Sequence, residues 1–387
     1  MIKVCHMTSA HAPEDDRIFH KECVSLKKAG YDVYLIEQGD SYEKNGVHII
    51  GIGNVIGGRL KRIFRVTKNV YKKALAVDAE IYHFHDPELI PYGLKLRRKG
   101  KNVIFDSHER YTEQLKDKPY LPKRLSQWVA KCYGIYERYA LKRLDAVIFP
   151  CTMGGENPFK GQCRRSVIIS NAAILGEFFD RYNPESPKKE NMVCYVGGLT
   201  EERGITNDIK AAYGAGATLA LAGLFSSKEY EASLREMAEY SCVEYRGLLN
   251  RESVAALLSE SCIGLCTLLD RGQYLKIDTF GIKVYEYMSM GLPVILSDSP
   301  YNQRMIKEYQ FGVCVNPESI DEIAAAIRYL LDSPEEAKRM GDNGRRAVEK
   351  EFNWGVEEKK LFAVYEDILE SRKDSSKADG AAVHYPL

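Results

Sequence analysis

The chain has 387 residues, of which 45% are hydrophobic and 28% are charged, and its formal net charge is +1. This length exceeds one typical domain and suits two domains of about 150 to 200 residues, each large enough for a core of its own. The composition is that of a soluble globular protein, and no apolar run reaches about 18 residues, which argues against a membrane-spanning helix.

The cysteines and the first residues indicate a compartment. Ten cysteines are scattered without a Cys-x-x-Cys pair, and the closest two, Cys262 and Cys266, lie within an apolar strand pattern. This arrangement favours buried, reduced thiols and no zinc site. An apolar strand pattern begins directly at Ile2–Cys5, without a secretory signal. We therefore expect a protein of the reducing cytoplasm.

Charge is divided unequally between the two halves of the chain. Residues 1–190 carry a net charge of +10, whereas residues 191–387 carry a net charge of −9. Such opposition predicts an anionic partner for the first half, either a nucleic acid or a membrane surface. Nucleic acid is the weaker expectation because no recognised binding motif accompanies the basic residues.

The first half alternates strand and helix patterns, which predicts a parallel, doubly wound α/β sheet. A polar loop with His11, Asp16 and Arg17 follows the first strand, and no Gly-x-Gly-x-x-G sequence is present there. The missing glycines count against a dinucleotide site and hence against an oxidoreductase. The expected strands are Ile2–Met7, Val33–Ile36, Val47–Ile50, Glu80–His85, Asn102–Asp106, Ala146–Phe149 and Ser166–Ile169.

A basic helical pattern covers residues 59–75, and it carries seven lysines and arginines beside an apolar side. An amphipathic helix of this kind can lie on anionic lipid. A second basic and aromatic stretch, residues 123–133 with Trp128, supports membrane or lipid-linked acceptor contact. The alternative is a solvated surface helix whose apolar stripe joins the domain core.

Polar side chains follow two of the expected strands. His85 and Asp86 come at the end of Glu80–His85, and His108 follows Asn102–Asp106. Open parallel sheets bind ligands at the carboxyl ends of their strands. The pattern therefore predicts a ligand-facing edge, although a single histidine is more often a structural hydrogen-bonding residue.

A polar, proline-bearing segment at Asn183–Asn191 is typical of a connection between domains, so we place the boundary between residues 182 and 183. The second domain, residues 183–355, opens with a strand at Met192–Val196. Gly197, Gly198 and Arg203 follow it. The glycines would let the backbone approach a phosphate, and Arg203 could neutralise its charge, although the pair can also mark a tight turn.

The segment Asp278–Asp298 sets Asp278 and Glu286 eight positions apart around a Phe280-Gly281 turn that opens a helix. Free amides in the first turn of such a helix form an anion site, and Glu286 could then reach a sugar hydroxyl. An ordinary amphipathic helix between two strands is the alternative. Further strands are expected at Thr218–Gly223, Val243–Leu248, Cys262–Leu268, Val294–Leu296 and Gly312–Val315.

This segment resembles the Glu-x7-Glu signature of the retaining, nucleotide-sugar-dependent glycosyltransferases of family 4, with Asp278 in place of the first Glu. The continuation Glu-Tyr-Met-Ser-Met-Gly-Leu-Pro-Val-Ile is similar too, and the resemblance covers nearly the whole chain. It implies the GT-B fold, in which two Rossmann-like doubly wound domains face each other across a cleft. Residues 1–182 would form the acceptor-side domain, residues 183–355 the nucleotide-sugar domain, and residues 356–372 a helix crossing back to the first. Residues 373–387 read as a disordered tail.

The resemblance also implies roles for individual residues. In the family the first acid meets the donor sugar and the second meets the ribose, while the amides between them meet the diphosphate. The implied catalytic residues are His108, Asp278 and Glu286; the implied donor and diphosphate residues are Gly197, Gly198, Arg203, Phe280, Gly281, Ile282 and Lys283; the implied acceptor-side residues are His11, Asp16, Arg17, His85 and Asp86.

The chain departs from the family pattern at the glycine turn. Gly198 stands where an Arg is typical and Arg203 stands where a Lys is typical, so one of two expected cations is missing, and Lys283 could compensate. No Asp-x-Asp motif is present, and we expect no catalytic metal and no cofactor apart from the donor substrate, such as a UDP-sugar or a GDP-sugar.

The expected function is transfer of a sugar from a nucleoside diphosphate to a glycan or lipid-linked acceptor, with retention, in polysaccharide or glycolipid assembly. The protein would be cytoplasmic, with peripheral contact at the inner membrane face through its basic first domain, and would not bind nucleic acid. A non-catalytic nucleotide-sugar-binding GT-B subunit and a GT-B epimerase of nucleotide-linked N-acetylhexosamines are the alternatives.

Overall fold

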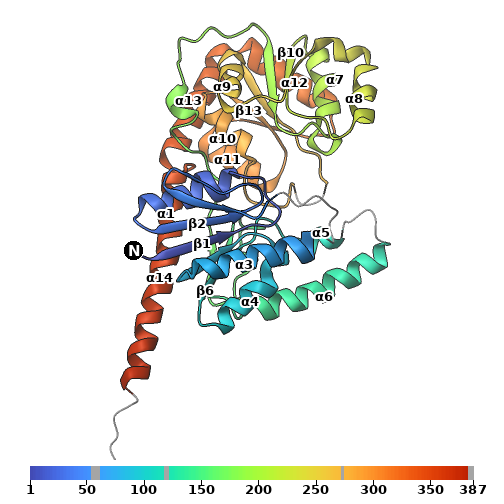
Figure 1. Cartoon of the computed structure of the whole chain (residues 1–387). Coiled ribbons are helices and arrows are strands. Elements are labelled where there is room, and N and C mark those ends of the chain that lie inside the picture. Colours follow the sequence, from blue (N-terminus) through green and yellow to red (C-terminus); the bar gives the residue numbers. More distant parts are fainter. Residues whose placement is uncertain (54–61, 117–121, 272–273, 382–387) are drawn as a thin grey trace, which may run out of the picture. The chain divides into compact units, whose positions relative to one another are not determined.

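The computed structural model describes residues 1–53, 62–116, 122–271 and 274–381, and it divides into two compact units. Unit 1 comprises Met1–Asn171 with Gly355–Leu387, and unit 2 comprises Ala172–Trp354. Each unit is built on its own sheet, and helices cover the sheet in each case (Figure 1). The prediction of two doubly wound, parallel-sheet α/β domains is confirmed.

The sheet of unit 1 has the strand order β3-β4-β2-β1-β5-β6-β7-β8 and is parallel except for β3, which pairs antiparallel with β4. The sequence prediction missed only this short edge strand, which a two-residue hairpin joins to β4: Asn45 and Gly46 both take positive φ, as a type I′ turn requires. The strands are β1 (Lys3–Met7), β2 (Asp32–Glu37), β3 (Tyr42–Lys44), β4 (Val47–Gly51), β5 (Ile81–Phe84), β6 (Asn102–Asp106), β7 (Ala146–Phe149) and β8 (Ser166–Ile168).

The helices of unit 1 include two features that the sequence did not indicate. The first helix begins as a π-helix, and the last helix continues to Ala381. The predicted disordered tail is therefore wrong over residues 373–381, and residues 382–387 are not described. Residues 59–61, the expected start of the basic helix, lie outside the described residues. The elements are η1 (Asp16–Cys23, the π-helix), α1 (Val24–Lys28), η2 (Arg62–Val66), α3 (Thr67–Val77), η3 (Pro87–Leu89), α4 (Ile90–Arg98), α5 (Tyr111–Lys116), α6 (Lys123–Leu141) and α14 (Trp354–Ala381).

The sheet of unit 2 is fully parallel, with the strand order β11-β10-β9-β12-β13-β14. Its strands are β9 (Met192–Val196), β10 (Thr218–Ala222), β11 (Val243–Gly247), β12 (Ile263–Cys266), β13 (Val294–Ser297) and β14 (Gly312–Val315). Its helices are η4 (Phe179–Arg181), η5 (Glu201–Arg203), α7 (Ile205–Gly214), α8 (Lys228–Arg235), η6 (Ala238–Cys242), α9 (Arg251–Glu260), α10 (Ile282–Ser289), α11 (Pro300–Tyr309), α12 (Ile320–Asp332) and α13 (Pro334–Lys350).

Two apolar clusters lie on opposite faces of the unit 2 sheet, because successive side chains of a strand point to opposite sides. Cys194 of β9 belongs to the cluster that contains α9, α10 and α13 residues, whereas Val193 and Tyr195 belong to the cluster with α7 and α12. Among the described residues, no helix of either unit has the length and the apolar content that crossing a membrane requires.

The boundary between the units falls between Asn171 and Ala172, earlier than the predicted position after residue 182. Residues just beyond it are tied to unit 2 by backbone pairing: the Ala173 N–H donates to the Phe352 carbonyl, and the Trp354 N–H donates to the Ala173 carbonyl. Polar composition marked an exposed segment at Asn183–Asn191 correctly, but it could not show which core the preceding residues join.

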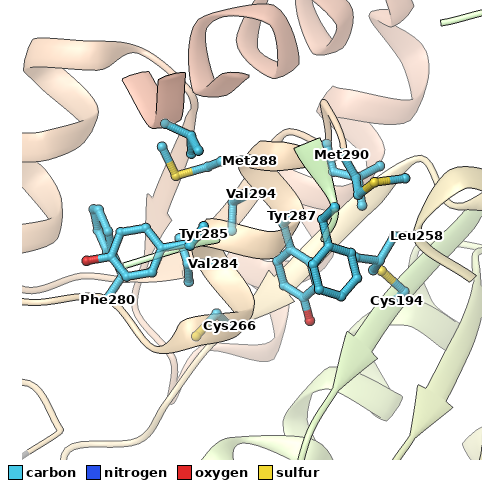
Figure 2. Close-up of a cluster of buried hydrophobic side chains, with 14 of the residues drawn as sticks. Cys194, Leu258, Cys266, Phe280, Val284, Tyr285, Tyr287, Met288, Met290 and Val294 are labelled. Atoms are coloured by element: carbon cyan, nitrogen blue, oxygen red, sulfur yellow. The ribbon is translucent and has the colours of Figure 1, made fainter. Parts of the chain in front are cut away.

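Several side chains of helix α10 enter a buried cluster, and Tyr287 is the one among them that bonds to the end of β9 (Figure 2). Tyr287 is fully buried, and its hydroxyl accepts a hydrogen bond from the Val196 N–H at 3.0 Å. Its ring occupies the space beside Gly264 of β12, where a Cβ would lie 2.4 Å from a ring carbon. The helix that carries the predicted signature therefore has a fixed position relative to the end of β9.

We expect Gly264→Ala to destabilise unit 2 by about 1–3 kcal/mol, because the added methyl group overpacks the Tyr287 ring. Denaturation by urea measures the change. Gly176→Ala is the matched control, since nothing lies within 4 Å of a Cβ at that position. Equal stability of the two variants would show that the ring moves aside at little cost.

Candidate functional site

The turn after β9 lets the backbone approach a ligand without side chains in the way. Gly197 has a φ of 136°, and its N–H donates to the Ala222 carbonyl at 2.9 Å. Gly223 follows β10 with a φ of 146°, and a Cβ there would lie 1.8 Å from the Gly197 carbonyl oxygen. The ends of two neighbouring strands therefore meet at a surface made of backbone atoms.

Two cationic side chains converge on this turn. A Cβ at Gly198 would lie 3.1 Å from Nη1 of Arg203, and a Cβ at Gly197 would lie 3.2 Å from Nζ of Lys283. Lys283 is held there by Tyr195: its Nζ donates to the tyrosine hydroxyl at 3.0 Å and lies 4.4 Å from the ring centroid. The site thus gathers two positive charges from η5 and α10 around one glycine pair.

A buried acid lies behind the cations. Asp208 of α7 is fully buried and accepts a hydrogen bond from the Thr267 hydroxyl, while Oδ2 has no hydrogen-bond partner among the described residues. Burial raises the pKa of Asp208 to about 7, and the bond from Thr267 and the charge of Lys283 act in the opposite direction. The charge balance of the site therefore depends on pH near neutrality.

The start of α10 is open on its ligand side. Gly281 is the N-cap residue, with nothing within 4 Å of a Cβ there, so the first amides of the helix, at Ile282 and Lys283, have room for an anion. The Phe280 ring is only 6% exposed and packs on Tyr301. Core packing thus occupies the Phe280 side chain, and only its backbone is left to meet a donor.

Glu286 is held by a partner that the sequence did not indicate. Its side chain is 6% exposed, and Oε1 accepts a hydrogen bond from Nη1 of Arg251 at 2.6 Å. Arg251 also pairs with Glu177. Asp278, the other predicted acid, is half-buried ahead of α10. The carboxylate of Glu286 is therefore oriented and paired with a cation.

An open pocket lies beside the glycine turn, and most of its wall is apolar. Its walls come from the carboxyl ends of β9 and β10, from the residues that follow β11 in the chain, and from the first turn of α9. Its lining residues are Val196, Gly197, Gly198, Ala222, Gly223, Leu224, Leu248, Leu249 and Val254.

In unit 1 the structure brings the predicted histidines together at the ends of β5 and β6. The His11 and His108 side chains are 21% and 18% exposed, and their ring centroids are 4.4 Å apart. His85 is fully buried behind them, with Nδ1 3.3 Å from Nε2 of His108. Of these three predicted residues, two reach the surface and one supports them.

Asp86 anchors the loop that follows β1. Its carboxylate accepts hydrogen bonds from the Thr8 hydroxyl at 2.9 Å, the Ser9 N–H at 2.5 Å and the Ala10 N–H at 3.2 Å, and it pairs with His11 at 3.2 Å. Burial alone would raise the pKa of Asp86. The hydrogen bond and the charge of His11, together with the bonds from Ser9 and Thr8, outweigh it and hold the pKa well below its ordinary value. Asp86 is therefore an ionised residue that fixes the loop.

Asp16 and Arg17 lie in η1 instead of the predicted loop. Arg17 is 3% exposed and donates to both carboxylate oxygens of Asp106, at 2.7 Å and 3.1 Å, and to the Ile169 carbonyl at 2.9 Å. Asp16 pairs with Lys21 at 2.7 Å. The predicted loop location is therefore wrong for both residues. Charged residues in a polar run can belong to a loop, but they can also begin a helix, and an arginine there can be buried in the domain core.

Sequence reasoning missed four residues that shape the site in unit 2: Tyr195, Gly223, Asp208 and Arg251. Gly223 carried a signal, since a glycine directly after a buried strand matches Gly197 after the neighbouring strand. The other three act through contacts between residues far apart in the chain, and no local pattern marks them.

Two family models match the chain. Residues 177–347 match glycosyl transferases group 1, and residues 17–157 match Glycosyltransferase Family 4. Curated relatives include an MMP alpha-(1→4)-mannosyltransferase of Mycolicibacterium hassiacum, 30% identical over 36% of this chain and 32% of its own length. An alpha-D-kanosaminyltransferase of Streptomyces kanamyceticus is 25% identical over 60% of this chain and 63% of its own length. Both matches span less than two thirds of the relative.

Solved structures resemble the chain over nearly its whole length. Sucrose-phosphate synthase from Thermosynechococcus elongatus matches with a TM-score of 0.75 at 17% identity, covering 96% of this chain and 100% of that chain. Anabaena HepE in complex with UDP and glucose matches with a TM-score of 0.70 at 13% identity, covering 95% and 100%. WaaG, a glycosyltransferase involved in lipopolysaccharide biosynthesis, matches with a TM-score of 0.68 at 15% identity, covering 94% and 99%. These likenesses confirm the predicted GT-B fold.

The pKa of Asp208 predicts that unit 2 loses stability as the pH rises. Because the folded pKa of about 7 exceeds the value of about 3.9 for an exposed aspartate, the folded state binds the proton more tightly. That stabilisation is fully present below about pH 4 and is lost as the pH rises through 7. Asp208→Asn keeps an acceptor for Thr267, and its stability does not depend on this titration. Its free energy of unfolding should therefore rise relative to that of the wild type by on the order of 2 kcal/mol between pH 5 and pH 8.

Urea denaturation at several pH values measures this difference. The exposed Asp332→Asn is the control and should track the wild type across the range. A constant difference between Asp208→Asn and the wild type would show that Asp208 is ionised in the folded protein throughout.

Proposed function

The chain belongs to the group 1 and family 4 glycosyltransferases of the GT-B fold, and we propose on this premise that it transfers a sugar from a nucleoside diphosphate sugar to a glycan or lipid-linked acceptor. The observation that carries the proposal is the convergence of Arg203 and Lys283 on the Gly197–Gly198 turn. Two cations beside exposed backbone form a site for a diphosphate, and the first amides of α10 add donors of fixed direction.

The neighbouring groups suit the rest of a nucleotide. Glu286, oriented by Arg251, presents a carboxylate that can accept hydrogen bonds from ribose hydroxyls. The apolar wall formed by Leu248, Leu249 and Val254 can cover the face of a base. We assign the sugar of the donor to the side of Asp278, which precedes the start of α10.

In the proposed reaction the bond between the anomeric carbon and the phosphate oxygen breaks, and a bond forms from that carbon to an acceptor hydroxyl oxygen. The hydroxyl proton passes to the departing diphosphate, on which negative charge grows. Arg203, Lys283 and the α10 amides stabilise that charge because they are already in place before the bond breaks. The proposed stereochemical outcome is retention. His108 is assigned to the donor sugar and His11 with Asp86 to the acceptor side, and His85 supports His108 from the interior.

The proposed donor is a UDP-sugar or a GDP-sugar. The structure of Anabaena HepE was determined with UDP and with UDP-glucose, which supports a uridine nucleotide among the candidates. The position of Lys283 beside Gly197 supports an active transferase over a non-catalytic subunit. Its ammonium group supplies a positive charge in place of the arginine that the family pattern has at position 198.

The basic surface of unit 1 supports an acceptor at a membrane. Helix α6 exposes Trp128 by 64% and Ile135 by 60% on a face that also carries the exposed Arg124 and Lys131. Apolar side chains that enter a lipid interface beside cations that meet its phosphates are the features of a peripheral membrane helix. We propose that the protein works at an anionic membrane surface and that its acceptor is carried there.

We expect Lys283→Ala and Arg203→Ala each to lower the rate of transfer about a hundredfold or more, because each removes a charge that stabilises the leaving diphosphate. Glu286→Ala should abolish transfer through loss of ribose binding. Release of the nucleoside diphosphate measures turnover, and thermal shifts with a panel of UDP-, GDP- and ADP-sugars measure donor binding.

Lys228→Ala, on the exposed face of α8, is the matched control and should retain full turnover. Melting curves of every variant establish that the fold is intact. Near-normal turnover by Glu286→Ala or Lys283→Ala would refute the donor site, and the absence of any thermal shift with the whole panel would refute nucleotide-sugar binding.

Membrane contact predicts that the protein sediments with anionic phosphatidylglycerol vesicles more than with neutral phosphatidylcholine vesicles, and less in high salt. Trp128→Ala should reduce the bound fraction several-fold. The control is Tyr329→Ala, which truncates a 47% exposed aromatic side chain of unit 2 and should leave binding unchanged. Equal losses for both variants would argue against α6 as the lipid-facing helix.

A further inference from the structure

Three histidines and one glutamate meet in the interior of unit 1. His6 lies on β1, His83 on β5, His85 directly after β5, and Glu22 on η1. All four side chains are fully buried. One ligand atom from each lies within 4.8 Å of the corresponding atoms of the other three. A group of this composition in the interior of a unit requires a physical reason.

The fold brings these side chains together through strand register and an unusual helix. β1 and β5 are parallel neighbours, with His6 directly paired to His83. His85 follows two residues later and therefore points to the same face. The π-helix η1 delivers Glu22 to that face, and π-helical turns are frequent at functional sites.

The distances suit a tetrahedral metal ion. Oε2 of Glu22 lies 3.8 Å from Nδ1 of His6, 3.7 Å from Nδ1 of His83 and 3.9 Å from Nε2 of His85. Nδ1 of His6 lies 3.0 Å from Nε2 of His85. A zinc ion with bonds of 2.0–2.1 Å separates its ligand atoms by about 3.4 Å, so small shifts complete the geometry.

The carboxylate at the centre of the cluster has few polar contacts. Among the described residues no N–H group donates to either oxygen of Glu22, and its carboxyl group contacts that of Asp106. Nε of Arg17 lies 3.3 Å from Oε1 of Glu22 and donates its hydrogen bond to Asp106. Glu22 and Asp106 therefore share the charge of Arg17, and a bound metal ion would supply further positive charge to these two buried carboxyl groups.

The imidazoles are prepared as ligands. Tyr365 orients two of the rings: its hydroxyl lies 2.9 Å from Nδ1 of His83 and 3.2 Å from Nε2 of His6, while Nε2 of His83 has no hydrogen-bond partner among the described residues. The third ring has an orienting partner too, since Nδ1 of His85 lies 3.4 Å from Oδ2 of Asp106. Such outer contacts fix ring orientation around protein-bound metals.

We propose that His6, Glu22, His83 and His85 bind one zinc ion in a closed, four-ligand site. Four protein ligands leave no position for a substrate, which indicates a structural role. The ion would lock β1, β5 and η1 together and hold His85, whose Nδ1 supports the exposed His108. The sequence pointed to no zinc site because its cysteines lack the spacing, whereas these ligands are spread from residue 6 to residue 85. The proposal does not depend on transferase activity.

The test measures zinc in protein made without a metal-affinity tag, denatured in guanidinium, refolded with or without Zn²⁺ and then dialysed. The wild type should hold about one zinc per chain and melt at a higher temperature after refolding with zinc. Glu22→Gln and His83→Gln should lose most of the zinc. His48→Gln is the matched control, since His48 lies partly exposed on β4 beside Asp32, and it should hold as much zinc as the wild type.

Cobalt keeps the test decisive if the ligand variants do not fold. Wild-type protein refolded with Co²⁺ should show the intense visible absorption of four-coordinate cobalt with nitrogen and oxygen ligands. Wild-type protein with no retained zinc, no change in melting and no cobalt spectrum would overturn the proposal. Equal zinc content in folded His83→Gln and in the wild type would overturn it as well.

Discussion

The hydrogen bond between the Tyr287 hydroxyl and the Val196 N–H is the contact on which the candidate donor site depends. It joins α10 to the last residue of β9, one position before the glycine turn. Lys283 lies on the same helix, one turn ahead of Tyr287, so the tyrosine fixes where that cation stands. A hydrogen bond of this kind contributes only about 1 kcal/mol to stability, yet it sets an alignment on which transition-state stabilisation depends far more steeply.

In unit 1 the residues beneath the ligand-facing edge are held by buried charged groups, because the interior there is polar. Arg17 donates to both oxygens of Asp106, and Glu22 lies close to the same guanidinium. Two buried carboxylates with one buried cation leave an excess negative charge unless a proton or a metal ion is present. What these buried charges do in the fold is hold His85 and His108 in place, since Asp106 lies 3.4 Å from Nδ1 of His85 and 3.3 Å from Nε2 of His108.

The sequence predicted the sheets well because buried parallel strands are short apolar runs, and those runs are local. It also predicted the glycine turn and the start of α10, where residue types alone restrict the backbone. It could not predict that the Phe280 ring enters the core or that Arg17 is buried, since either residue type also occurs facing a ligand. Arg251 illustrates the limit: its bond to Glu286 joins positions 35 residues apart, and no periodicity encodes it.

The departure at Gly198 is better understood as a relocation of charge than as a loss. Nη1 of Arg203 lies 3.1 Å from the place that a Cβ at Gly198 would take, so the guanidinium already occupies the space that a side chain at position 198 would enter. A side chain there would press on the guanidinium, and Arg203 would have to shift by a few tenths of an ångström. Lys283 approaches Gly197 from α10, whereas Arg203 approaches from η5. It therefore supplies a second cation without competing for the space beside Gly198. The glycine and the two cations therefore form one arrangement, in which the absence of a side chain at position 198 is what lets Arg203 reach the turn.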